Sequence, residues 1–297
     1  MQQLLNDQFV AVAADDWYQR RRKDETGQFF WKVASQGPRD PKGTQQGHYV
    51  FTAQGKLLGY NNNRGAEKRL VMMKEALKKW NDLSENERKG EIPKKGNDDG
   101  NYHHDLPEGG KIVKVCTRLL EHRDGRLQKL AAGTVGNQAA VDHLWFRKSE
   151  VEKLAELVSS GGGEIPEWLA LRIAKFHLRD NTRGEPRDWK REEIKKWSLK
   201  VDGEGKLSGR FLIDSSDGKL GYEGEISGMM AVQDRVLTQF DLLVIGQHWG
   251  HSRYTVGSRP GKTPMGQVFR LTDGKSAADR IPPQGMRWAP GYWDPSK

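Results

Sequence analysis

The most regular alternation of apolar and polar positions in this chain lies between Leu207 and Thr255. Within it, the segments 206–213, 220–226 and 236–246 place apolar side chains at every second position, with turn residues between the segments. Such period-two alternation is typical of antiparallel strands. Because several glycines interrupt these segments, we predict a curved sheet or a partial barrel.

The last of these strands differs from the others because Leu242 to Ile245 are apolar at both parities. A strand that is apolar on both sides is typical of the centre of a sheet with both faces covered. The strand ends in His248-Trp249-Gly250-His251, where side chains can face a pocket or solvent.

The flanking sequence predicts further elements of the same domain. Strands are expected at 111–120, 126–132, 141–146 and 266–271. Helices are expected at 149–157, with Ser149 as the N-cap, and at 166–178. The aromatic tail from Ile281 to Trp293 is expected to pack over the sheet.

The first part of the chain alternates between strand and helix patterns. We predict a strand at 8–14, a helix at 26–35, a hairpin of 47–52 with 56–60, and an amphipathic helix at 66–83. Residues 86–110 are rich in lysine, glycine and proline, which indicates a linker. The expected organisation is a domain at 1–85, a linker at 86–110 and a domain at 111–297.

Residues 5–83 resemble part of a thioredoxin-like domain. The segment Tyr49 to Leu58 is similar to the hairpin of that family, and Phe9 to Trp17 resembles its second strand and the following loop. The sequence has no counterpart of the family's CxxC segment, and no proline stands at Gly47-His48, where the family has its cis-proline. The resemblance therefore implies a small, incomplete and non-redox version of the fold.

The fold class expected for the whole chain is α+β. A small thioredoxin-like N-terminal α/β layer would precede a larger antiparallel β-rich domain with two helices. The low mean hydropathy of −0.83 is offset by ten tryptophans and nine phenylalanines, which predict small cores built on aromatic rings.

The charge pattern gives more information about the surface of the protein than about the kind of partner it binds. The net charge is +9, but 49 basic and 40 acidic residues are interleaved, which is typical of a solvated mixed surface. The single cysteine, Cys116, excludes an internal disulfide and any CxxC centre. No apolar run approaches the ~20 residues of a membrane span, and Met1 to Leu5 lack signal-peptide features. We therefore expect a soluble protein, cytoplasmic as given and secreted or periplasmic if a leader was removed.

Several motif-based enzyme classes are not indicated. The sequence contains no G-x-S-x-G, H-E-x-x-H or EF-hand pattern, and Gly161 to Glu164 lack the Lys-Ser/Thr of a phosphate loop. The histidines indicate another kind of site, a metal site. If His248, His251 and His143 meet in space, they form a site for a divalent metal; the alternative is that they are separate surface or hydrogen-bonded side chains.

We therefore expect a ligand site at the end of the strand run. The residues expected to contact ligand are His248, Trp249, His251, Tyr254, His177, Asp180 and Arg183. The leading hypothesis is a non-redox ligand-binding or scaffolding protein that uses the C-terminal sheet. Its partner would be a small acidic ligand, paired with Arg183, or a protein. The alternatives are a histidine-centred metal-dependent hydrolase, and nucleic-acid binding through the basic surface.

Overall fold

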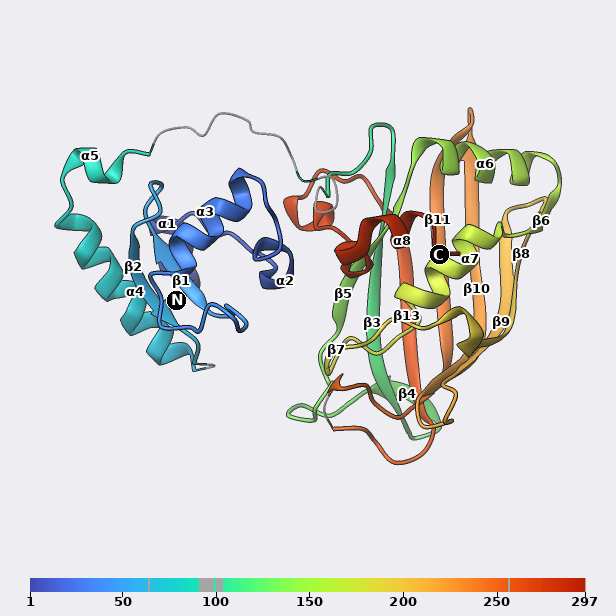
Figure 1. Ribbon diagram of the computed structural model, residues 1–297. Helices are drawn as coiled ribbons and strands as arrows, with labels where there is room; N and C mark the ends of the chain where they lie inside the picture. The colour runs from blue at the N-terminus through green and yellow to red at the C-terminus, as the bar shows by residue number, and fades with distance from the viewer. Residues whose placement is uncertain (64, 91–98, 100–103, 256, 297) are drawn as a thin grey trace. The chain divides into compact units, whose positions relative to one another are not determined.

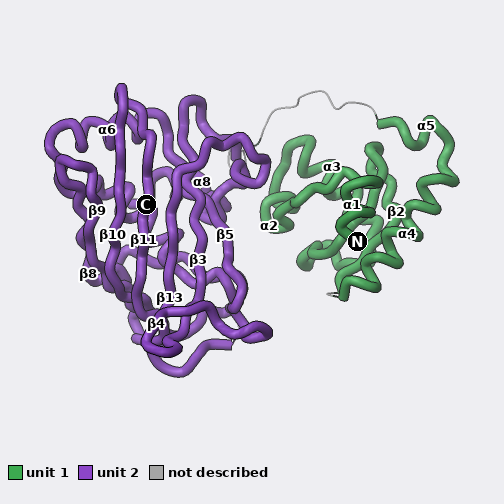
Figure 2. Tube along the Cα trace, turned by 180° about the vertical axis from the view of Figure 1, so that it is seen from behind, with its two compact units in different colours: residues 1–103 green, residues 104–297 purple. Residues whose placement is uncertain are grey.

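A computed structural model describes residues 1–63, 65–90, 99, 104–255 and 257–296. The chain forms two compact units, residues 1–103 (unit 1) and 104–297 (unit 2), which Figure 2 shows in different colours. Much of the predicted linker 86–110 lies outside the described residues. Its first residues belong to a short helix, α5 (Glu85–Arg88).

Unit 1 contains one hairpin and several helices. Its elements are α1 (Gln2–Gln8), α2 (Asp16–Gln19), α3 (Glu25–Ala34), β1 (His48–Phe51), β2 (Leu57–Asn61), α4 (Ala66–Asn81) and α5. The predicted hairpin and the helices at 26–35 and 66–83 are confirmed. Met72, Met73 and Ala76 of α4 are buried, and a Cβ at Gly59 of β2 would lie 2.8 Å from the Met72 Sδ, so glycine permits this close packing.

The predicted strand at 8–14 is wrong. Residues 9–15 have no regular secondary structure, and Val10 and Val12 are 93% and 74% exposed. A strand is stabilised by pairing with a neighbour, and in the described part of unit 1 the paired strands are β1 and β2. The apolar pattern of this segment was therefore not sufficient to form a strand.

Unit 2 is built on a nine-stranded antiparallel sheet (Figure 1). Its strands are β3 (Lys111–Arg123), β4 (Arg126–Lys129), β5 (Ala140–Phe146), β6 (Gly162–Glu164), β8 (Ile194–Asp202), β9 (Lys206–Asp214), β10 (Gly221–Gln233), β11 (Val236–Trp249) and β13 (Thr263–Thr272). The order is β4-β3-β13-β11-β10-β9-β8-β6, and β5 also pairs with β3. The described strands do not close into a barrel, because β6 and the β4/β5 end do not pair.

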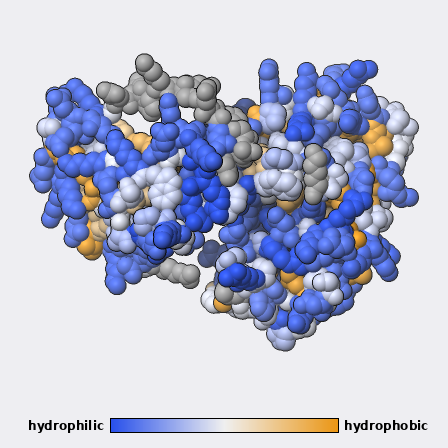
Figure 3. Space-filling model, viewed as in Figure 1, coloured by the Kyte–Doolittle hydropathy of each residue, from blue (hydrophilic) through white to orange (hydrophobic). Residues whose placement is uncertain are grey.

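Helices cover one face of this sheet. They include α6 (Lys148–Ser159) and α7 (Glu167–Phe176); α8 (Ala289–Trp293) and the 3₁₀ turns η1 (Arg191–Glu193) and η3 (Gln284–Trp288) complete the helical elements on this side. The 3₁₀ turn η2 (Ala277–Arg280) lies against the opposite face, where Asp279 pairs with Lys114 of β3 at 3.0 Å. The predicted N-cap Ser149 is wrong: the helix begins after Arg147, whose backbone N–H donates to the Glu150 side chain at 2.8 Å. Figure 3 shows that the surface on this side of unit 2 is mostly hydrophilic.

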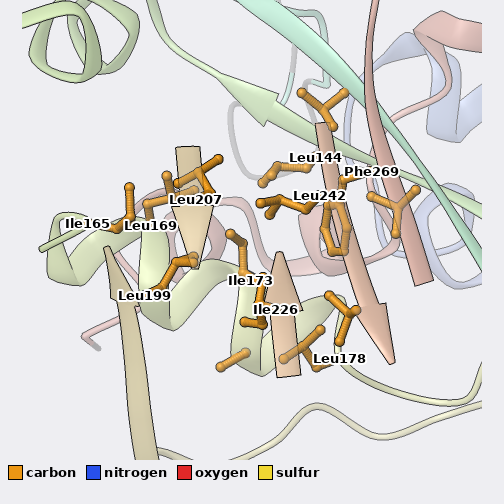
Figure 4. Packing of buried hydrophobic residues seen from close by; sticks show 14 of the residues in the cluster. Leu144, Ile165, Leu169, Ile173, Leu178, Leu199, Leu207, Ile226, Leu242 and Phe269 are labelled. Carbon is orange, nitrogen blue, oxygen red and sulfur yellow. The ribbon is translucent and has the colours of Figure 1, made fainter. Parts of the chain in front are cut away.

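The core lies between the sheet and the helices. Figure 4 shows Leu169 and Ile173 of α7 packed toward Leu207, Ile226 and Leu242 of the sheet. The opposite face is open to solvent in the centre, where Leu243 is 45% exposed. The prediction that β11 is covered on both faces is therefore wrong, although the strand is central, between β13 and β10.

A buried arginine connects the helices, the edge strand β5 and the C-terminal segment. Arg172 is fully buried, and it donates to both Glu150 carboxylate oxygens at 2.7 and 2.9 Å. It also donates to the backbone carbonyls of Trp145, Tyr292 and Trp293 at 3.0–3.2 Å. The Trp145 N–H donates in turn to the Tyr292 hydroxyl at 3.1 Å, so the aromatic tail covers the edge strand.

We expect Arg172→Met to lower the free energy of unfolding of unit 2 by about 3–5 kcal/mol, because it leaves the Glu150 carboxylate buried without its cation. The matched control is Arg191→Met, which removes an exposed ion pair with Glu167 and should cost no more than about 1 kcal/mol. Urea denaturation followed by circular dichroism measures both. Equal shifts of the two midpoints would contradict the role given to Arg172.

Candidate functional site

The end of β11 and the loop after it form one wall of the candidate site. His248 lies on the inner face of the strand and is 4% exposed, whereas His251 is exposed beyond the turn at Gly250. Gly250 has a φ of +79°, and a Cβ there would lie 1.9 Å from the Lys219 carbonyl oxygen. Glycine is therefore needed for the chain to reverse direction after the strand.

The second wall is the loop that follows α7. Its buried Asp180 accepts hydrogen bonds from the Thr182 N–H and hydroxyl at 2.9 and 2.6 Å and pairs with Arg183. Arg183 donates to the Gly250 carbonyl at 2.9 Å, which ties the two loops together. The short strands β7 (Gly184–Glu185) and β12 (Tyr254–Thr255) pair across the same junction.

The two walls enclose a small polar pocket, which we call the β11-end pocket. Its lining residues are Arg179, Asp180, Arg183, Pro186, Arg187, Trp189, Leu220, His248, His251, Ser252 and Thr255. Its volume is about 10 Å³, which is close to the smallest that holds one water molecule. The structure thus brings together four of the predicted ligand residues: Asp180, Arg183, His248 and His251.

Arginines dominate the charged lining of the pocket, and each of them is paired with a carboxylate. Its lining carries three arginines and one aspartate. Arg187 makes a bidentate pair with Glu193, both contacts at 2.7 Å, and Arg179 pairs with Asp188, whose side chain is 53% exposed. Sequence reasoning missed Arg179 and Arg187 as site residues, although the arginine spacing of four at 179, 183 and 187 was a usable signal.

Burial of the ring lowers the pKa of His248 to about 4; the Asp180 carboxylate opposes this shift, and the charges of Arg183 and Arg259 add to it. The imidazole is therefore neutral at pH 7, and it can both donate and accept a hydrogen bond.

A serine-hydrolase arrangement is not assembled in the pocket, although Ser252, His248 and Asp180 all line it. The Asp180 carboxylate is engaged by Thr182 and Arg183. The Ser252 hydroxyl contacts the Glu185 carbonyl and the Thr255 hydroxyl, both at 3.4 Å. Neither group is directed at the imidazole, as a nucleophile and an orienting carboxylate must be.

Two other predicted residues lie nearby but do not line the pocket. The Trp249 indole N–H donates to the Gly218 carbonyl at 3.1 Å, and the Lys262 ammonium lies 4.5 Å from the ring centroid. Tyr254 is 62% exposed, with the Arg253 guanidinium 5.3 Å from its ring centroid.

His177 belongs to a different buried group. Its Nδ1 lies 3.2 Å from the Asp142 carboxylate, and its backbone carbonyl accepts from the Gln267 side chain at 2.9 Å. Burial raises the pKa of Asp142, but the hydrogen bond and charge of His177 and the charge of Arg179 lower it overall. Asp142 thus pairs with the ring of a distant histidine, whereas from its neighbour His143 it accepts the backbone N–H at 2.8 Å, because the His143 ring points to the other face of the strand.

The structure does not bring His143 near His248 and His251. His143 pairs across the sheet with Lys114, in the same row as Arg270 and Asp241. His248 lies seven residues beyond Asp241 on β11, which is about 23 Å along a strand. Among the described residues, no group of three or more His, Cys, Asp or Glu side chains gathers as a metal site.

Comparisons of the chain with protein-family models, curated proteins and solved structures found no match. Within the described ranges, no helix has the length and apolar character needed to cross a membrane. The site therefore has to be interpreted from its own geometry.

The pKa of His248 predicts a loss of stability in mild acid. Between about pH 6.5 and pH 4 the unfolded chain protonates this imidazole and the folded chain does not, so protons favour unfolding. We expect the free energy of unfolding to fall by roughly 3 kcal/mol from this group across that interval. Urea denaturation at a series of pH values should show a shallower fall for His248→Gln. His251→Gln, at an exposed position, should keep the wild-type slope, and identical slopes for all three proteins would refute the assignment.

Proposed function

We propose that this protein is a non-redox binding protein that recognises an acidic group at the β11-end pocket. The observation that carries the proposal is the convergence of Arg179, Arg183 and Arg187 with His248 and His251 on one pocket. Guanidinium groups recognise carboxylates and phosphates through charge-assisted hydrogen bonds. The acidic group would belong to a small ligand or to a side chain of a protein partner.

The small volume of the pocket limits how the group enters. Space for about one water molecule admits a single oxygen atom of a carboxylate, while the rest of the ligand stays outside, over the exposed His251. In the ion pair of Arg179 the Asp188 side chain is 53% exposed, and exposed pairs contribute little to stability. An incoming carboxylate can therefore exchange with Asp188 at a small cost, whereas the buried Glu193 stays paired with Arg187.

The neutral state of His248 favours this interpretation over a fixed anion site built from charged groups alone. A neutral imidazole donates to the ligand oxygen without needing a proton from solvent at pH 7. Binding of an anion would offset the repulsion from Arg183 and Arg259, so the pKa of His248 should rise when the ligand binds.

The alternatives remain open to direct tests. A metal-dependent hydrolase, with a divalent metal held by His248, His251 and His143, would retain stoichiometric metal on purification; its structural basis is weak, because His143 lies far from the other two histidines. Nucleic-acid binding would show a steep loss of affinity for single-stranded oligonucleotide with salt. It has less structural basis than the acidic-group site, because the aromatic rings of β9, β10 and β13 point into the core, as Phe211, Tyr222 and Phe269 do.

A thioredoxin-like origin of residues 5–83 is also a proposal. The hairpin β1–β2 followed by α4 agrees with the family's order of elements. The irregular segment at 9–15 does not. In this proposal unit 1 has no redox role, because the resemblance lacks a CxxC segment.

Acetate is a suitable probe of the pocket, with acetamide as the uncharged control of the same shape. In NMR titrations of the full chain at constant ionic strength, acetate should shift the imidazole signals of His248 and His251 to saturation, and acetamide should not. Arg187→Gln should weaken acetate binding about ten-fold, because it removes one charge-assisted hydrogen bond.

The matched control is Arg253→Gln, which removes an exposed arginine outside the pocket and should leave the affinity unchanged. Equal binding of acetate and acetamide would refute the proposal, as would equal effects of the two substitutions.

A further inference from the structure

The three arginines of the β11-end pocket differ in the carboxylates that hold them. Arg183 and Arg187 pair with carboxylates whose side chains are 2% and 5% exposed. Arg179 pairs with Asp188, whose side chain is 53% exposed. Breaking a buried ion pair is strongly destabilising, whereas an exposed pair contributes little to stability. Arg179 is therefore the arginine of this pocket whose carboxylate partner can leave most easily.

The described residues satisfy the hydrogen-bond donors of the Arg179 guanidinium only in part. The Arg179 side chain is 4% exposed, and its Nη atoms donate to the side chains of Asp188 and of Gln284, the second at 3.3 Å. Its Nε is buried and has no hydrogen-bond partner among the residues that the structure describes. A buried donor without an acceptor is unfavourable, so an oxygen atom that reaches Arg179 through the pocket would satisfy this group.

The Asp188 carboxylate can turn away from Arg179, but the backbone of Asp188 is held in place. The next residue, Trp189, is buried, and its indole N–H donates to the Leu178 carbonyl at 2.8 Å. The Arg187 guanidinium donates to the Asp188 carbonyl at 3.0 Å. A carboxylate that a ligand displaces therefore stays within the length of one side chain from the site, as a second negative charge beside the ligand.

We propose that Asp188 is an internal competitor for Arg179, and that it selects ligands that carry a cation next to their acidic group. This inference rests on the proposed acidic-group site. A plain carboxylate that binds Arg179 lies beside the displaced Asp188, and the two negative charges repel each other. A zwitterion offers its carboxylate to Arg179 and its ammonium to Asp188, so two ion pairs with the ligand replace one within the protein. The ligand class is therefore the amino acids and other small compounds with an ammonium near the carboxylate.

The position of Asp188 agrees with this division of the ligand. Asp188 pairs with Arg179 of the pocket lining but does not itself line the pocket. Because the pocket has space for about one oxygen atom, the ammonium would stay outside it, where the exposed carboxylate lies. The Lys175 ammonium also interacts electrostatically with Asp188, but it is buried and donates to the Pro295 carbonyl at 2.7 Å. It therefore stays in place when the Asp188 side chain turns.

Acetate and glycine, which is acetate with an added ammonium group, separate the two parts of the proposal. Affinities come from the imidazole signals of His248 and His251 in NMR titrations of the full chain at neutral pH and constant ionic strength. Glycine should bind the wild-type protein about five-fold more tightly than acetate, because it gains one ion pair with an exposed carboxylate. Asp188→Asn should bind acetate about three- to five-fold more tightly than the wild type does, and it should bind glycine no more tightly than acetate.

The matched control is Glu192→Gln, which removes a 69% exposed carboxylate from the same segment of the chain. In the wild type this carboxylate lies 3.9 Å from the Lys190 ammonium. The affinities of Glu192→Gln for both compounds should equal those of the wild type. An equal gain in acetate affinity for the two variants would reveal a general effect of charge and would overturn the proposal.

The Nε–H signal of Arg179 gives a readout that does not depend on affinity. Acetate and glycine should both shift this signal. The Nε–H signal of Arg172, which donates to the Tyr292 carbonyl at 3.0 Å in the core, should stay in place. An Arg179 signal that does not move at saturation would overturn the assignment of Arg179 as the anchor.

The remaining outcomes separate this inference from the proposed function. Unchanged affinities in Asp188→Asn would overturn the role of Asp188 but leave the acidic-group site in place. Glycine that binds the wild type no more tightly than acetate would overturn the selection of zwitterions. Binding of neither compound by the wild type or by either variant would overturn the acidic-group site, and this inference with it.

Discussion

The guanidinium group of Arg172 is the interaction on which the architecture of unit 2 depends most. It is fully buried, and its five N–H donors reach five acceptors on α6, β5 and the C-terminal segment. The C-terminal segment is far from β5 and α6 in the sequence, and each of the three would leave a polar group unsatisfied in the core without the others. A buried hydrogen-bond network with missing partners is less stable than an apolar core. The helix α6, the strand β5 and the C-terminal segment can therefore only be ordered together.

One-sided burial of the sheet explains which parts of the fold the sequence predicted. The strands at 206–213, 220–226 and 236–246 were recognisable because alternation records a buried face directly. Leu243 was expected to be covered but is exposed to solvent. The sequence pattern is the same whether a helix or solvent lies over an apolar residue on the outer face of a strand. Residues 8–14 were misread because pairing, which the pattern does not encode, decides whether an apolar segment becomes a strand.

The sequence predicted the members of the candidate site only where they are close to one another in the chain or follow the end of one strand or helix. His248, His251, Asp180 and Arg183 meet because the loop after α7 and the end of β11 lie at one end of the sheet. His177 was expected in this site, but it lies outside the pocket and pairs with Asp142 of β5, because α7 ends beside that strand. Distances of this kind depend on strand order, which local periodicity does not specify.

The position of β13 has a consequence for how unit 2 is made in the cell. This strand lies between β3 and β11, so it joins the early strands to the later hairpins, yet it is translated about 140 residues after β3 ends. At a synthesis rate of about 5–20 residues per second, the ribosome needs roughly 10–30 s to reach it. For that time β3 stands beside the translating ribosome with one edge unpaired, and a chaperone that shields strand edges would act in this interval.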